Sequence, residues 1–192
     1  MTYDELLDTV TSYTIRDDLP VTTFIKLAEA TLRPIAKHYL AEKIATLTVA
    51  DDMADLPDDF LEIRAITAES RQTYKPVSPA NANLFERQIG YYRAGDVLSF
   101  IPHADTAVDD EVSLLYAASF PALTADQSNW LFERFPAVYL RAILKEANRY
   151  LKDAEGIAIE DTALKEELSI LAEDDRRGRQ TGPIIWEQAT CQ

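Results

Sequence analysis

The chain has 192 residues, of which 47% are hydrophobic and 27% are charged, a balance that supports a buried core in one domain, or in one domain with an excursion. Its formal net charge of −14 disfavours a protein that grips nucleic acid by the phosphates, because such binding depends on lysine and arginine. The single cysteine, Cys191, excludes a disulfide framework within the chain, and no run approaches the ~20 apolar residues that span a bilayer.

The N-terminal segment predicts a helix over about 2–13, because Thr2 begins the spacing of a capping box and apolar residues recur on one helical face. This acidic, amphipathic start lacks the basic flank and the continuous apolar stretch of a signal peptide. We therefore expect a soluble protein that is made in a reducing cytoplasm. A second helix is predicted over about 21–40, and Pro34 predicts a kink or a break after Leu32.

The middle of the chain changes to the alternating pattern of strands, which predicts a β excursion over about 44–118. Gly95 lies between two of the expected strands and supplies the positive φ that a tight hairpin turn requires. The expected strands are Thr46–Val49, Glu62–Thr67, Tyr91–Arg93, Val97–Ile101 and Val112–Ala118. The simplest arrangement of these strands is one small antiparallel sheet.

The last third predicts helices over about 125–153 and 161–177. Thr124 has capping-box spacing with Gln127, which marks the start of a short helix. Pro136 fits the first turn of the long helix that follows, where its missing N–H is not needed.

Within these helices, two leucines and two glycines carry specific expectations. Leu144 and Leu151 fall on the stripe that should face the core. Gly156 should end the long helix, and Gly178 stands where a C-terminal glycine cap follows the last helix.

These elements together predict an α+β fold that is mainly α. We expect a bundle of about four helices with a small antiparallel β excursion and an extended C-terminal arm. One domain should cover 1–177, and the arm should cover 178–192.

Residue types that catalyse reactions or bind metals are sparse. His38 and His103 are the only histidines, and neither has a second histidine or a cysteine at ligand spacing, so no zinc site is predicted. A Cys–His pair would have to use Cys191 in the terminal tail. The chain has no glycine-rich phosphate loop, G-x-S-x-G motif or nucleotide fingerprint. We therefore expect no catalytic residues, no metal ligands and no cofactor.

The acidic loop DDMADLPDDFLE is the best candidate for a cation site. With Asp51 first, acidic residues fall at the fifth and twelfth positions of a calcium loop. However, Met53 stands at the third position, and Leu56 stands where the loop requires glycine. A solvated acidic turn, with Asp58 or Asp59 capping one helical turn, fits this loop better.

The C-terminal segment combines a basic cluster with an apolar group. Three arginines suit either the negative end of a helix dipole or an anionic partner. The apolar group follows in a segment that would be polar if it only extended into water. We expect an arm that docks on another subunit, with Trp186 as its anchor. The residues of this expected partner-binding site are Arg176, Arg177, Arg179, Ile184, Ile185 and Trp186.

Five passages follow one another in a recognisable order. The helical passage LAEATLRPIA is followed by LPDDFLEIRAI, and then by the hairpin passage YYRAGDVLSFIP. The passages LLYAASFPALTADQSNWL and PAVYLRAILKEANRYLKD complete the order. Over roughly residues 15–155, this arrangement resembles the head-to-tail adaptor proteins of short-tailed bacteriophages, which are also called connector or head-completion proteins.

The resemblance implies a helical bundle with a β excursion, no enzymatic activity, and a homo-oligomeric ring, usually twelvefold, under the portal protein. The ring would join the head to a tail nozzle or tail tube protein and would continue the channel, so that DNA passes through without specific binding. The expected location is the head-to-tail junction of the virion, after assembly in the host cytoplasm, with no membrane partner. The acidic composition agrees, because a negative lumen repels the duplex.

Two alternatives remain open. The same bundle could be a monomeric or dimeric interaction module of another assembly that forms no ring. The acidic loop could instead support a metal-assisted hydrolase.

Overall fold

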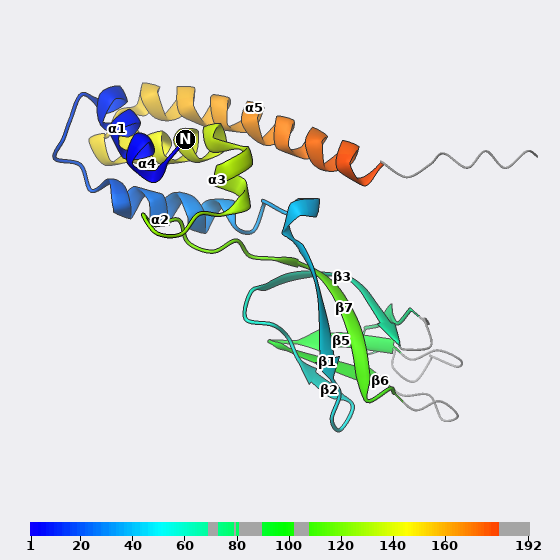
Figure 1. Ribbon diagram of the computed structural model, residues 1–192. Coiled ribbons are helices and arrows are strands. Elements are labelled where there is room, and N and C mark those ends of the chain that lie inside the picture. The colour runs from blue at the N-terminus through cyan, green and yellow to red at the C-terminus, as the bar shows by residue number, and fades with distance from the viewer. Residues whose placement is uncertain (69–72, 79, 81–89, 102–107, 181–192) are drawn as a thin grey trace, which may run out of the picture. The chain divides into compact units, whose positions relative to one another are not determined.

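The computed structural model describes residues 1–68, 73–78, 80, 90–101 and 108–180. These residues form two compact units (Figure 1). The helical unit comprises Met1–Leu32 and the described part of Pro121–Gln192, and the β unit comprises Arg33–Phe120. The mainly α, α+β class predicted from the sequence is confirmed.

The helical unit contains five α-helices within its described residues. They are α1 (Tyr3–Thr14), α2 (Val21–Leu32), α3 (Trp130–Arg134), α4 (Pro136–Leu151) and α5 (Ala154–Arg179). The predicted capping box of α1 is confirmed, since the Thr2 hydroxyl accepts a hydrogen bond from the Glu5 N–H at 3.1 Å and the Glu5 carboxylate accepts one from the Thr2 N–H at 2.7 Å. Pro136 occupies the first turn of α4, as predicted.

Helix α2 is shorter than the predicted helix over 21–40. It ends at Leu32, which confirms the break expected before Pro34. His38, which the sequence placed in this helix, instead caps a short 3₁₀ helix, η1 (Tyr39–Ala41), by accepting a hydrogen bond from the Leu40 N–H at 3.2 Å.

The predicted bounds of the last helix were wrong at both ends. Helix α5 begins after Asp153, whose carboxylate accepts a hydrogen bond from the Gly156 N–H at 3.0 Å, so Gly156 helps to start α5 and does not end α4. A Cβ added at Gly156 would lie 2.5 Å from an Asp153 carboxylate oxygen, so a close approach explains this glycine. Gly178 lies inside α5, which continues to Arg179, and is therefore not the predicted cap.

Helix α3 has a different cap from the one predicted. The Asn129 side chain accepts a hydrogen bond from the Phe132 N–H at 3.0 Å, so Asn129 is the residue that begins the helix. Thr124 exchanges backbone hydrogen bonds with Gln127 in a separate turn.

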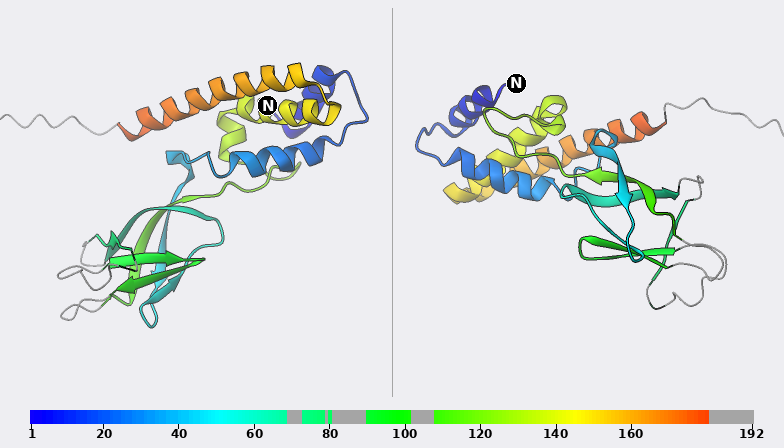
Figure 2. Two further views of the ribbon diagram at one scale, coloured as in Figure 1. Left: turned by 180° about the vertical axis from the view of Figure 1, so that it is seen from behind. Right: turned by 60° about the horizontal axis from the view of Figure 1, so that its bottom comes forward.

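The core of the helical unit surrounds α4, which packs against α1, α2, α3 and α5. Leu144 is 2% exposed, as expected of a core residue, whereas Leu151 is only half-buried. Figure 1 and the left view of Figure 2 show α4 between α2 and α5. The main buried side chains are Leu6, Val10, Phe24, Ile25, Leu32, Leu131, Phe132, Val138, Tyr139, Ile143, Leu144, Leu164 and Leu171.

The β unit contains two sheets, where the sequence suggested one. In the first sheet β7 lies between β1 and β3, and in the second the order is β2-β6-β5-β4. All pairs are antiparallel except the short pair of β4 with β5, which is parallel. The strands are β1 (Glu42–Thr48), β2 (Met53–Asp55), β3 (Phe60–Ala68), β4 (Lys75–Pro76), β5 (Gly90–Ala94), β6 (Val97–Ile101) and β7 (Glu111–Ala118).

The two sheets share one hydrophobic core, because each buries one face of its strands. The alternation predicted in β7 is confirmed, since Val112, Leu114 and Tyr116 are buried in this core. Leu98 and Phe100 reach the same core from β6. The predicted hairpin of β5 and β6 is also present, and Gly95 has a φ of 64° in its turn.

Candidate functional site

The predicted basic cluster lies on the last turns of α5, where its charges are paired within the helix. Arg176 lies 2.7 Å from the Glu173 carboxylate, and Arg177 lies 3.5 Å from it. Arg179 lies 2.9 Å from Asp175. The hydrogen bond from Arg176 lowers the pKa of Glu173 below its usual value. Ile184, Ile185 and Trp186, the apolar half of the predicted partner-binding site, lie outside the described residues.

The acidic loop forms a tight turn and does not have the form of a calcium loop. Asp51 and Asp52 have φ values of 50° and 58°, and the backbones of Ala50 and Met53 exchange hydrogen bonds across them. Positive φ at both central residues is characteristic of a type I′ hairpin turn. No group of three or more metal-ligating side chains occurs in the part of the chain that the structure describes.

Asp59 lies in a polar cluster at the start of β3 and caps no helical turn, contrary to prediction. Its carboxylate accepts hydrogen bonds from Lys43 at 2.6 Å and from the Tyr116 hydroxyl at 2.8 Å. Burial alone would raise the pKa of Asp59, but these two hydrogen bonds outweigh it and lower the pKa. Burial, followed by the contact with Asp59, raises the pKa of Tyr116 to about 12. The cluster therefore ties β1, β3 and β7 together.

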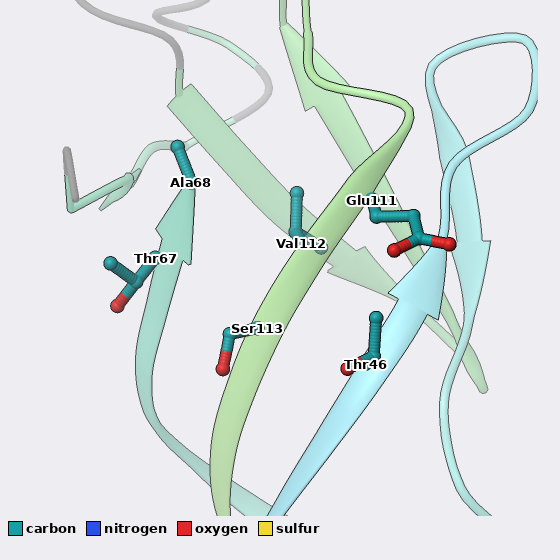
Figure 3. A pocket seen from close by; sticks show the side chains of 6 residues that line it. All are labelled: Thr46, Thr67, Ala68, Glu111, Val112 and Ser113. Carbon is teal, nitrogen blue, oxygen red and sulfur yellow. The ribbon is translucent and has the colours of Figure 1, made fainter. Parts of the chain in front are cut away.

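A shallow depression of about 160 Å³ lies on the face of β1, β7 and β3 that carries the polar side chains (Figure 3). Thr46, Ser113 and Thr67 stand directly opposite one another in the strand register, so three hydroxyl-bearing side chains cross the sheet in one row. Among the described residues of the lining, Glu111 is the only charged one. A hydroxyl nucleophile needs an adjacent base such as histidine, and the described residues of the lining include no histidine, so they give this row of hydroxyls no partner for catalysis.

Sequence reasoning missed a buried polar network in the helical unit. The Glu29 side chain, 2% exposed, accepts hydrogen bonds from the Leu123 N–H at 2.7 Å and from the Tyr139 hydroxyl at 3.0 Å. Asn129 donates hydrogen bonds to the Tyr139 hydroxyl at 2.7 Å and to the Pro121 carbonyl at 3.0 Å. A glutamate on the apolar side of α2, within the passage LAEATLRPIA, was the available signal. The network positions the segment that precedes α3.

Ion pairs neutralise most of the lysine and arginine side chains that the structure describes. Most of the described lysines and arginines lie within 4 Å of a carboxylate, in both units. Lys145 and Lys165 both pair with Asp161, and their hydrogen bonds lower the pKa of Asp161 to about 2. The described residues thus offer no basic groove that could neutralise a run of phosphates.

No helix in the described part of the chain has the length and apolar character needed to cross a membrane.

Comparison with known proteins identifies the family. No curated protein matches the chain. A family model described as "SU10 adaptor protein" matches residues 1–186, which is nearly the whole chain. The chain therefore belongs to the SU10 adaptor protein family, the head-to-tail adaptors of short-tailed phages, whose members are structural components of the virion that meet portal and tail components.

Proposed function

We propose that this chain forms a closed, twelvefold ring between the portal protein and a tail nozzle or tail tube protein, and that the ring continues the DNA channel. The observation that carries this proposal is the family match over residues 1–186. A ring of identical subunits needs head-to-tail contacts, in which one face of each copy meets a different face of the next copy. The role is structural, with no catalytic step, cofactor or metal.

The charge distribution supports passage of DNA without adhesion. The net charge of −14 is combined with cations that are mostly neutralised by neighbouring carboxylates. A surface of this kind repels the phosphate backbone, and it releases few counterions on contact with a duplex. The channel is therefore expected to let the genome slide in both packaging and ejection.

The segment after α5 supplies the contact with another subunit in this proposal. Ile184, Ile185 and Trp186 are three consecutive large apolar residues in the segment after Gln180, and tryptophan is favoured at the centre of interfaces. Because α5 is helical to Arg179, the cluster of Arg176, Arg177 and Arg179 belongs to the end of a rigid helix and precedes the arm. The arm docks on the portal or on the adjacent adaptor, with the arginines facing acidic groups of that partner.

The ring is tested by measuring mass. The pure chain is examined by native mass spectrometry over a range of concentrations, alone and with the assembled portal protein encoded by the same phage genome. We expect a discrete complex with one closed set of adaptor copies on each portal, twelve if the proposed symmetry is correct. A chain that remains a monomer or a dimer in both conditions would overturn the ring, and it would favour the non-ring interaction module instead.

A further inference from the structure

Helix α4 has α2 and α5 on opposite faces. Tyr139 and Tyr150, which contact α2, are eleven residues apart and so lie on one face of α4, three turns from each other. Arg141 and Lys145, which form ion pairs with α5, are one turn apart on another face. At 100° per residue these two faces are about 150° apart around α4. The outer faces of α2 and α5 therefore point in nearly opposite directions from the helical unit.

The outer face of α5 carries exposed isoleucines with glutamates beside them. Ile159 and Ile170 are 58% and 54% exposed, although isoleucine is usually buried. Ile159 lines a hollow together with small residues such as Ala163, and Glu155 and Glu166 also belong to its lining. Neither glutamate forms an ion pair within the described residues. This face, defined by these five residues, is the α5 face.

The outer face of α2 has the complementary character. Leu27 is 48% exposed, and Thr23, Lys26 and Ala30 are exposed at positions one turn of helix or less from it. Lys26 forms no ion pair within the described residues, and the only carboxylate of α2, Glu29, is buried and accepts a hydrogen bond from Tyr139 of α4. In a chain with a net charge of −14, this surface, the α2 face, is free of acidic side chains.

We infer that the α5 face of one copy docks on the α2 face of the next copy in the ring. The inference rests on the proposed ring and names the surfaces that build it. Leu27 would pack against Ile159 and Ile170, while Lys26 would meet Glu155 or Glu166. Because the two faces point in nearly opposite directions, each copy can bind one neighbour on each side, which is the head-to-tail contact that a ring requires.

The charged side chains also favour contact between an α5 face and an α2 face over contact between two α5 faces or two α2 faces. Two α5 faces in contact would bring Glu155 and Glu166 of one copy against the same carboxylates of the other. Two α2 faces would place one unpaired Lys26 against a second. Like charges across an interface disfavour wrong partners, so the mixed pairing of α5 with α2 is the one that the side chains support.

The pairing of the α2 and α5 faces is tested by reversing the charge on one face and then exchanging the charges of both faces. Assembly of each variant is followed by native mass spectrometry, as for the wild-type chain. Lys26→Glu should raise the concentration needed for half-assembly of the ring at least about tenfold, because it places a carboxylate against Glu155 and Glu166. Combining Lys26→Glu with Glu155→Lys and Glu166→Lys should restore assembly, since the charges are then exchanged. Lys75→Glu, an exposed lysine of the β unit, is the matched control and should assemble normally. Each variant is compared by melting temperature to confirm that it is folded.

Each outcome decides the inference. If Lys26→Glu assembles like the wild-type chain, or if the triple variant does not recover, the pairing of the α2 and α5 faces is wrong while the ring itself stands. Ile159→Glu provides an independent check and should also prevent assembly without unfolding the exposed face. If the wild-type chain forms no ring at all, both the proposed function and this inference fall.

Discussion

The hydroxyl of Tyr139 donates a hydrogen bond of 3.0 Å to the carboxylate of Glu29, although the two residues are 110 positions apart in the sequence. Both side chains are buried, at 0% and 2% exposure. The same carboxylate oxygen accepts a hydrogen bond from the Leu123 backbone, which joins α2, α4 and the segment before α3 in one contact. A buried polar group without a partner is costly, so each member of this network depends on the others.

Tyr139→Phe should lower the free energy of unfolding by about 1–3 kcal/mol, because it removes one donor from Glu29 and one of the two acceptors of the Asn129 amide, which keeps only the Pro121 carbonyl. Urea unfolding followed by circular dichroism measures this change. In a double-mutant cycle with Glu29→Gln, the two substitutions should be coupled by at least about 0.5 kcal/mol. Additive effects would show that the two residues act independently and that the network does not function as a unit.

Leu144→Ala should destabilise the protein by about 2–5 kcal/mol, because it opens a cavity beside α4 where the leucine is 2% exposed. Ile170→Ala is the matched control, since it shortens an apolar side chain that is 54% exposed, and it should change stability by no more than about 0.5 kcal/mol. Thermal melting of the two variants side by side separates them. Equal melting temperatures would mean that Leu144 does not face the core.

Elements with strong local signals could be predicted from the sequence. The reciprocal hydrogen bonds of Thr2 and Glu5 involve residues three apart, so their spacing alone predicts them. Gly95 in its hairpin and Pro136 in the first turn of α4 are likewise fixed by backbone preferences of one residue. The order of the five passages also indicated the fold class and the family of phage structural adaptors, without any site chemistry.

Elements that depend on tertiary contacts could not be predicted in the same way. Asn129 replaces Thr124 as a helix cap because its amide also donates to the Tyr139 hydroxyl, a contact that sequence spacing does not reveal. Sequence spacing predicts a helix end at Gly156, yet a glycine is needed there because the nearby Asn148 and Asp153 side chains leave no room for a Cβ. The hydrophobic side chains of α2 and α5 that remain exposed could also be identified only from the packed structure.

The raised pKa of Tyr116 predicts that the folded protein loses stability at high pH. Burial and the contact with Asp59 raise the pKa of Tyr116 from 10.0 to about 12 in the folded protein. Because the folded value exceeds the unfolded one, the stabilisation is complete below about pH 10 and disappears as the pH rises through about 12. Tyr116→Phe should therefore flatten the loss of melting temperature over this range, whereas Tyr13→Phe, at an exposed position, should not. An unchanged alkaline slope for Tyr116→Phe would contradict the assignment.

The isolated protein should have no useful affinity for duplex DNA at about physiological salt, because its charge is −14 and most described cations are paired with carboxylates. An electrophoretic mobility shift with a duplex of random sequence measures this, and lowering the salt should not produce a shift either. A tight complex that weakens steeply with salt would show a basic surface and would count against a channel that lets DNA slide.

The arm should carry affinity for the partner and should not contribute to the fold of the isolated chain. Burying Ile184, Ile185 and Trp186 could contribute on the order of 5 kcal/mol before the cost of ordering the segment is subtracted. A variant that ends at Gln180 should therefore bind the portal assembly at least about tenfold more weakly, with an unchanged melting temperature. Trp186→Ala should account for much of that loss, whereas Gln188→Ala in the same segment should bind normally. Unchanged binding of the shortened chain would refute docking by the arm. A lower melting temperature for Trp186→Ala in the isolated chain would show instead that the tryptophan packs in its own subunit.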